Sequence, residues 1–226
     1  MSRRHLRGAL ALGSLMVWFA SGCSRYPPAP EKPDISPREA GRAAIAQYDA
    51  NNDGRLDGTE LEKCPSLWGA RKRIDTSGDA VLTADEIAAR VNYWLHCGTI
   101  VMSGVTLITL DGKPLAGATV TFEPEEFLGP GFTACQGVTD ETGRASIKGP
   151  DPKYPGIYLG LYRVKVSKVV GSRETIPARY NTQTELGFEA TDDIPGVGNI
   201  EFHLKREQMR NSPILENSKR RLQQRP

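Results

Sequence analysis

Two twelve-residue segments, residues 49–60 (DANNDGRLDGTE) and 75–86 (DTSGDAVLTADE), carry oxygen-bearing side chains at positions 1, 3, 5, 9 and 12. A hard cation such as calcium prefers oxygen ligands, and a loop of this length can wrap around one ion. We therefore predict two calcium sites. The expected ligands are Asp49, Asn51, Asp53, Arg55, Asp57 and Glu60 in the first loop, and Asp75, Ser77, Asp79, Val81, Thr83 and Glu86 in the second.

The sixth position distinguishes the two loops. Gly54 provides the sharp turn in the first, whereas Ala80 stands there in the second. A residue with a Cβ is strained at positive φ by about 1 kcal/mol, so we expect the second loop to bind more weakly. At position 7, Arg55 and Val81 would contribute backbone carbonyls, and at position 9 Asp57 would act through a water molecule.

A single acidic loop of this kind can also be a solvated turn. Two complete copies, ending in Glu60 and Glu86, favour metal binding instead. Calcium is favoured over magnesium because a bidentate glutamate suits the larger ion with more than six ligands. Loops in exported proteins bind calcium at about 10⁻⁴ to 10⁻³ M, and we expect permanently occupied, structural sites.

Helices are predicted on both sides of each loop. Ser36, Pro37 and Glu39 form a helix-start signal ahead of the first loop. The ligands at positions 9 and 12 of each loop also occupy the cap and third positions of the outgoing helix. Leu56 and Leu82, both at position 8, are placed to pair as short strands. Residues 38–96 resemble a paired EF-hand domain, which we place at 36–97.

Three cysteines follow Cys23, namely Cys64, Cys97 and Cys135, so at most one intramolecular bridge can form among them. Cys64 and Cys97 each follow the helix that leaves a loop. We favour a disulfide between Cys64 and Cys97, with buried free thiols or a pairing with Cys135 as the alternatives.

After residue 98 the pattern changes to short runs rich in Val, Ile, Thr and Tyr, separated by Gly, Pro and Asp turns. Strands at this spacing without helices between them predict an antiparallel β-sandwich. The expected strands are residues 105–110, 118–122, 145–147, 162–169, 185–190 and 199–204. The predicted fold class is therefore α+β and multidomain, with a small helical pair before a sandwich at 98–205.

The segments LDGKPLAGATVTF (110–122), TDETGR (139–144) and GLYRVKVS (160–167) resemble the carboxypeptidase regulatory-like, transthyretin-like sandwich. That resemblance implies an accessory domain without catalytic residues, in which Asp111, Asp140 and Gly143 form turns. Aromatic residues in the long connections could create an edge that binds sugar or peptide, or could pack into the rim of the sandwich. These residues are Phe127, Phe132, Tyr154 and Tyr158.

The N-terminal segment predicts export. Residues 1–22 have a basic head, an apolar stretch too short to span a bilayer and then small residues, as in a secretion signal. The residues before Cys23 resemble the bacterial lipobox, which predicts lipidation of Cys23 and attachment to a membrane; a plain signal with an ordinary cysteine is the alternative. Residues 23–35 are a proline-rich spacer. The chain resembles exported bacterial lipoproteins of planctomycete type.

The remaining composition argues against several functions. Only His96 and His203 follow the signal, which excludes a multi-histidine zinc centre, and nucleophile-elbow and phosphate-loop motifs are absent. The net charge of +2 is near neutral, and residues 206–226 form a basic tail predicted to be disordered or to contact an anionic surface. We expect no nucleic-acid partner.

These observations predict a calcium-binding, lipid-anchored protein of the cell envelope with a structural or interaction role. A calcium sensor is disfavoured because Met102 and Met209 are the only methionines after the signal and neither lies in the loop pair. The alternative is an accessory lipoprotein that recognises an envelope protein or polysaccharide and serves a hydrolase. An enzyme is the third possibility, and we do not expect one.

Overall fold

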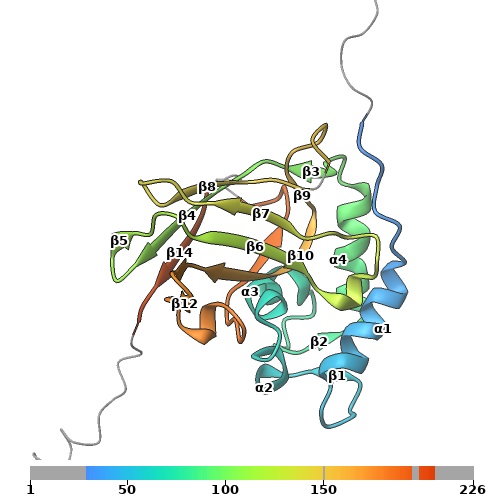
Figure 1. Ribbon diagram of the computed structural model, residues 1–226. Coiled ribbons are helices and arrows are strands. Elements are labelled where there is room, and N and C mark those ends of the chain that lie inside the picture. The colour runs from blue at the N-terminus through green and yellow to red at the C-terminus, as the bar shows by residue number, and fades with distance from the viewer. Residues whose placement is uncertain (1–28, 150, 195–198, 207–226) are drawn as a thin grey trace, which may run out of the picture.

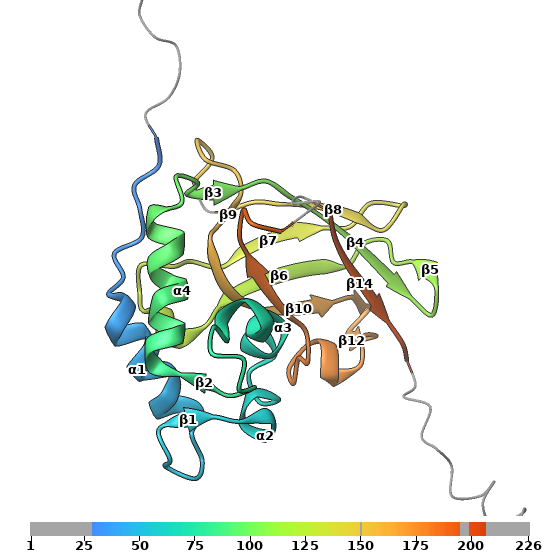
Figure 2. The ribbon, with the colours of Figure 1, turned by 180° about the vertical axis from the view of Figure 1, so that it is seen from behind.

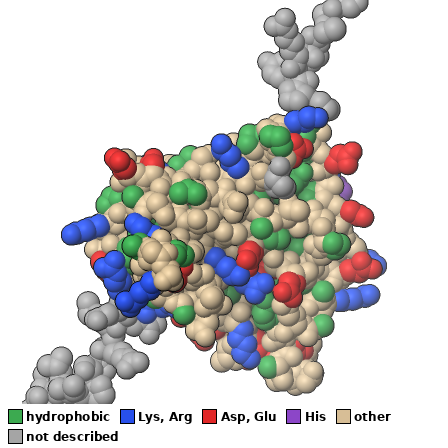
Figure 3. Space-filling view, in the orientation of Figure 1, with side chains coloured by type: hydrophobic (Ala, Val, Ile, Leu, Met, Phe, Trp, Pro, Cys, Tyr) green, Lys and Arg blue, Asp and Glu red, His purple; other side chains and the backbone are tan. Residues whose placement is uncertain are grey.

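The computed structural model describes residues 29–149, 151–194 and 199–206 (Figure 1). The signal at 1–22, Cys23 and the tail beyond residue 206 lie outside these residues, and the predictions made for them stay predictions. None of the helices in the described part of the chain has the length and apolar character needed to cross a bilayer. Figure 3 shows both acidic and basic side chains on the visible face, in line with the net charge of +2.

Four helices occupy the first part of the described chain: α1 (Pro37–Tyr48), α2 (Gly58–Leu61), α3 (Pro65–Ile74) and α4 (Ala84–His96). The predicted start of α1 is confirmed, because the Ser36 side chain accepts a hydrogen bond from the backbone N–H of Glu39 and Pro37 occupies the first turn. Asp57 with Glu60, and Thr83 with Glu86, form complete capping boxes at α2 and α4. Local sequence therefore sets where these helices begin.

Helices α1 and α4 lie side by side in both ribbon views (Figures 1 and 2). Gly41 permits this close approach, because a Cβ added there would stand 2.2 Å from the carbonyl oxygen of Ala84. The short strands β1 (Arg55–Leu56) and β2 (Leu82–Thr83) pair antiparallel with Leu56 opposite Leu82. Both leucines are fully buried, which confirms the pairing predicted at position 8 of the loops.

The later strands of the described chain form two four-stranded sheets and two short ribbons. One sheet has the order β13 (Gly187–Ala190), β10 (Gly160–Ser167), β6 (Thr119–Pro124) and β7 (Cys135–Val138). The other contains β14 (Asn199–Leu204), β4 (Gly104–Leu110), β5 (Lys113–Pro114) and β8 (Arg144–Ile147). The ribbons are β3 (Val101–Met102) with β9 (Ile157–Tyr158), and β11 (Val169–Val170) with β12 (Arg173–Glu174).

Each of the six predicted strands has a counterpart, and the class is a mixed α+β fold whose sheets are mostly antiparallel. Alternation of apolar residues located these strands. The purely antiparallel arrangement, however, is wrong at one place: β14 pairs with β4 in parallel, with Asn199 beside Val105 and Leu204 beside Leu110. The chain passes from β13 at the edge of one sheet to β14 at the edge of the other, where this direction buries Ile200 and Leu204.

The turn residues behave as expected. Asp111 and Gly143 adopt positive φ values of 54° and 76°. The Asp140 carboxylate accepts hydrogen bonds from the backbone N–H groups of Thr142 and Arg144 at 2.8 and 3.0 Å. These residues therefore form turns, as predicted.

The predicted disulfide between Cys64 and Cys97 is wrong for this structure, which holds Cys64, Cys97 and Cys135 as free thiols. Cys64 lies at the start of α3, where its Sγ is 3.4 Å from the Ser66 hydroxyl. Cys97 follows α4, and its Sγ donates to the carbonyls of Trp94 and Thr99. The helix after the first loop ends at Leu61, so Cys64 does not end that helix as predicted but stands at the N-cap of α3.

The helices pack directly on the first sheet, with α3 against β13 and β10 (Figures 1 and 2). Gly187 in β13 meets the start of α3 so closely that an added Cβ would stand 2.1 Å from the carbonyl carbon of Pro65. The buried apolar residues of the helices and sheets form one continuous core. The two predicted domains therefore share an extensive boundary.

Candidate metal centre

Position 1 of both loops is held by the same pair of hydrogen bonds. One carboxylate oxygen of Asp49 accepts from the backbone N–H of Asn52 at 2.6 Å, and the other accepts from Gly54 at 2.9 Å. Asp75 does the same in the second loop: it accepts from Gly78 at 2.6 Å and from Ala80 at 3.0 Å. The first ligand position is thus fixed at the centre of each turn.

Position 12 also matches between the loops. In the first, Glu60 Oε1 accepts from the N–H groups of Ala50 and Asn51 at 2.7 and 3.3 Å, and Oε2 accepts from Asp57 at 3.1 Å. The glutamate therefore ties the start of the loop to its end.

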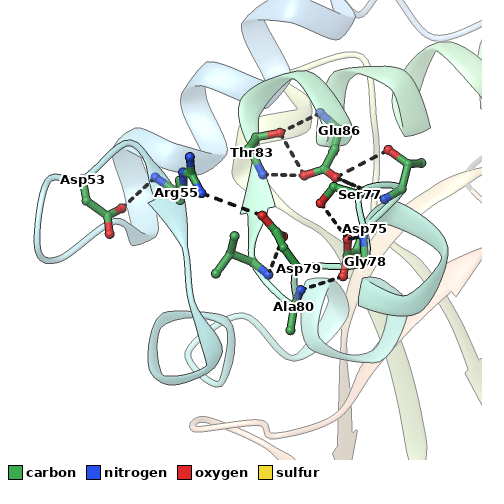
Figure 4. Close-up of polar contacts among 11 residues, drawn as sticks. Asp53, Arg55, Asp75, Ser77, Gly78, Asp79, Ala80, Thr83 and Glu86 are labelled. Carbon is green, nitrogen blue, oxygen red and sulfur yellow. Dashed lines mark hydrogen bonds and ion pairs between the residues drawn. The ribbon is translucent and has the colours of Figure 1, made fainter.

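In the second loop, Glu86 Oε1 accepts from Thr76 and Ser77 at 3.1 Å each, and Oε2 accepts from the N–H of Thr83 at 3.0 Å (Figure 4). Burial by itself would raise the pKa of Glu86, but these hydrogen bonds, with Thr83 first, lower it. The pKa of Asp75 is lowered chiefly by the N–H of Gly78. Both carboxyl groups are therefore ionised at neutral pH, as ligands of a cation must be.

The backbone conformation repeats as well. Position 6 has positive φ in both loops, 83° at Gly54 and 68° at Ala80, and position 4 does too, 61° at Asn52 and 77° at Gly78. Ala80 thus adopts the left-handed conformation predicted for it, and this conformation disfavours a residue with a Cβ. At position 6 the second loop therefore carries that strain and the first does not, whereas at position 4 the first loop has Asn52, a residue type that tolerates this conformation, and the second has Gly78.

The predicted ligands lie along the two loops, and their side chains bind backbone N–H groups and, in the pairs Asn51–Asp53, Ser77–Asp75 and Thr83–Glu86, one another. Among residues 29–149, 151–194 and 199–206, no group of three or more His, Cys, Asp or Glu side chains is arranged to hold a metal ion. The donor set itself fits calcium, because the predicted side-chain ligands all present oxygen and the pKa values of Asp75 and Glu86 are lowered. The loops therefore supply the right chemistry, with the ligands turned onto the backbone.

One contact connects the loops to each other. The Arg55 Nη1 in the first loop lies 3.8 Å from Asp79 Oδ2 in the second (Figure 4). Both side chains are about half exposed, at 57% and 46%. Sequence reasoning assigned Arg55 only a carbonyl and did not foresee this ion pair.

Two buried acidic residues outside the loops were also missed. Glu189 on β13 has a fully buried side chain that pairs with Arg73 and Arg90 at 2.5 Å each and accepts from the indole of Trp94 at 3.2 Å. Arg90 extends this network to Asp193 at 2.7 Å. The network joins the two helices that flank the second loop to the sheet.

Glu125, just before the 3₁₀ helix η1 (Glu126–Leu128), forms the second junction. It accepts from the Ser66 hydroxyl at 2.8 Å and from the Tyr48 hydroxyl at 3.2 Å, and Arg163 lies 3.6 Å away. Burial raises the pKa of Glu125, and burial also raises the pKa of the nearby Cys64 thiol to about 12. A glutamate after a strand in sequence gives no sign of such burial, because its partners come from distant segments.

The sequence left open whether the aromatic residues of the long connections pack inside or lie at a surface edge, and the structure contains both cases. Phe127 and Phe132 are buried in the core, whereas Tyr154 and Tyr158 are partly exposed. Tyr154 and Pro155 line an open surface groove of about 380 Å³. His96 and His203 are exposed, as expected of surface residues.

Comparison of the chain with protein-family models, with curated proteins and with solved structures returned no match.

Proposed function

We propose that this protein binds calcium through residues 49–60 and 75–86 and uses the ions to stabilise its helical segment on the sheets. The observation that carries this proposal is the repeated hydrogen-bond scheme: positions 1 and 12 make the same backbone contacts in both loops. The paired β1 and β2 strands support a likeness to a paired EF-hand. When calcium binds, the carboxylates of each loop would turn from the backbone toward the ion.

A structural role is favoured over switching by the way the helices are attached. A calcium sensor needs an apolar surface that opens to a partner when the ion binds. Here β13 already covers α3, and Glu189 is bound by side chains of both α3 and α4. The sheet thus occupies the face that a sensor would expose, and the ions would rigidify a closed assembly.

The cellular location of the protein and the likeness of its sheets to a known sandwich are also part of the proposal. The signal and lipobox pattern support an exported protein anchored to a membrane through Cys23, and two four-stranded sheets with a shared core support the likeness to a transthyretin-like sandwich. Replacement of Cys23 by Ser should move the protein from the membrane to the soluble fraction of the cells that export it. Unchanged membrane attachment of that variant would refute the anchor.

The calcium proposal is tested by calorimetric titration of residues 24–226. Two unequal sites are expected near millimolar calcium, with Glu60→Gln removing the tighter one and Glu86→Gln the weaker. Glu62→Gln is the matched control, since Glu62 is an exposed glutamate adjacent to the first loop and is not a predicted ligand. No binding at millimolar calcium, or equal losses in all three variants, would refute the proposal.

An accessory recognition role is the second candidate. The open groove beside Tyr154 and Pro155 favours it, because an aromatic ring at a surface groove suits a sugar ring or a peptide side chain. In a pull-down assay with cell-wall polysaccharide, weaker retention of Tyr154→Ala than of the parent protein would support this role. Equal retention of the variant and the parent protein would argue against it.

A further inference from the structure

The backbone of Arg55 is part of the first loop, whereas its side chain contacts the second loop. Its N–H donates to Asp53 Oδ1 at 2.9 Å within the first loop. It pairs with Thr83 across the β1–β2 ribbon, and its guanidinium reaches Asp79 of the second loop at 3.8 Å (Figure 4). Asp79 stands at position 5, where a carboxylate ligand is predicted.

The first loop contacts the second through its position-7 side chain, but the second loop does not contact the first in the same way. Val81 is the position-7 residue of the second loop, and its apolar side chain cannot form a matching ion pair with the first. Within the described part of the chain, Asp53 forms no salt bridge with Lys or Arg, whereas its counterpart Asp79 does. The second loop therefore presents a carboxylate whose charge is partly compensated, and the first presents one that is not.

We propose that Arg55 is a positioning residue that lowers the cation affinity of the second loop. This inference rests on the proposed calcium function. A cation entering the second loop must compete with the guanidinium for Asp79, and it meets an extra positive charge beside the site. Arg55 thus acts in addition to Ala80 and makes the first loop fill before the second.

The solvent exposure of the Arg55–Asp79 ion pair sets the size of its expected effect on calcium affinity. An exposed ion pair is worth little, and its measured range corresponds to a change of about 1.4- to 5-fold in an equilibrium constant. The pair here is about half exposed on both sides, so loss of the guanidinium should tighten the second site by about two- to fivefold. Salt screens such charges over about 10 Å at 0.1 M and about 3 Å at 1 M, so the gain should shrink with salt.

Strain at Ala80 predicts a different response of the calcium affinity to salt. Ala80→Gly removes a backbone cost of about 1 kcal/mol, which corresponds to about fivefold in affinity, and that cost does not depend on ionic strength. Salt dependence therefore separates the two causes of weak binding in the same loop.

The test is calorimetric calcium titration of residues 24–226 carrying Glu60→Gln, so that the second loop alone is read. Arg55→Gln, Arg55→Lys and Ala80→Gly are compared at low salt and at about 1 M salt. Arg173→Gln is the matched control, because Arg173 is an exposed arginine in the β12 ribbon and its loss changes the net charge equally. Circular dichroism confirms that each variant is folded.

Arg55→Gln should bind about two- to fivefold more tightly than the parent at low salt and about equally at high salt. Arg55→Lys and Arg173→Gln should stay near the parent value, and Ala80→Gly should tighten binding at both salt levels. If the parent binds calcium but Arg55→Gln behaves like Arg173→Gln, or keeps its gain at high salt, the role of Arg55 is refuted while calcium binding stands. If neither the unmodified chain nor any variant binds calcium, the proposed function itself fails.

Discussion

Replacing Glu189 by Gln tests how firmly the helices are attached to the sheets. Its carboxylate is fully buried and lies 2.5 Å from both Arg73 and Arg90. Removal of one partner from a buried ion pair costs about 3–5 kcal/mol, because the other charge is left uncompensated. Two features reduce that cost here: Arg90 keeps Asp193 at 2.7 Å, and Arg73 is 32% exposed to solvent.

We therefore expect Glu189→Gln to lower the free energy of unfolding by about 2–3 kcal/mol. The glutamine retains an oxygen that can accept from the Trp94 indole, so the loss reports mainly the charge. In a folded chain of this size the melting temperature should fall by about 5–10 °C. Glu201→Gln is the control, since that side chain is 51% exposed and its loss should change stability by less than about 0.5 kcal/mol.

Urea unfolding followed by two probes gives the measurement. Fluorescence of Trp68 and Trp94 reports the helical segment, and far-ultraviolet circular dichroism reports helices and sheets together. Both probes should show one transition that shifts by the same amount in Glu189→Gln. A helical transition that separates from that of the sheets in the parent protein, or a variant as stable as the control, would refute the attachment that we infer.

Gly187→Ala should lower the free energy of unfolding in urea by about 3 kcal/mol or more, because the new Cβ would lie 2.1 Å from the carbonyl carbon of Pro65. Gly69→Ala in the open middle of α3 is the control, which should cost nothing and add helix propensity. Equal effects of the two substitutions would contradict this packing. The hydrogen bond from Arg90 lowers the pKa of Asp193 to about 2, so its stabilising effect is present above about pH 4, the unfolded value, and is lost as the pH falls toward 2. Asp193→Asn should thus be less stable than the parent by about 1–2 kcal/mol at pH 7, after allowance for partial exposure, and equally stable near pH 2. A difference that does not depend on pH would show that the carboxylate charge is unimportant.

The features that sequence predicted well are those that depend on near neighbours. Helix starts at Ser36, Asp57 and Thr83 follow from side chains that reach the backbone two or three residues away. The turn at Ala80 follows from its place in a twelve-residue repeat. The strands follow from apolar alternation, since one face of each had to be buried.

The features that sequence missed depend on distant partners. Glu189 and Glu125 look like surface acids beside their own neighbours, and they are buried only because Arg90 and Ser66 are brought to them from 99 and 59 residues away. Helix ends that resemble each other in sequence suggested a disulfide, but α2 ends at Leu61 and Cys64 stands at the N-cap of α3. The Arg55–Asp79 pair required knowledge of where the β1–β2 ribbon points one side chain.

The parallel pairing of β14 with β4 has a consequence for how the molecule comes to be folded. Asn199 and Val105 are neighbours across the ladder although 94 residues separate them in the chain, so this contact has a high loop-closure cost and forms late. Ile200 and Leu204 complete the core only when the last described strand has been synthesised. Until then β4 lacks its β14 partner, and the growing chain presents that edge of the sheet unpaired.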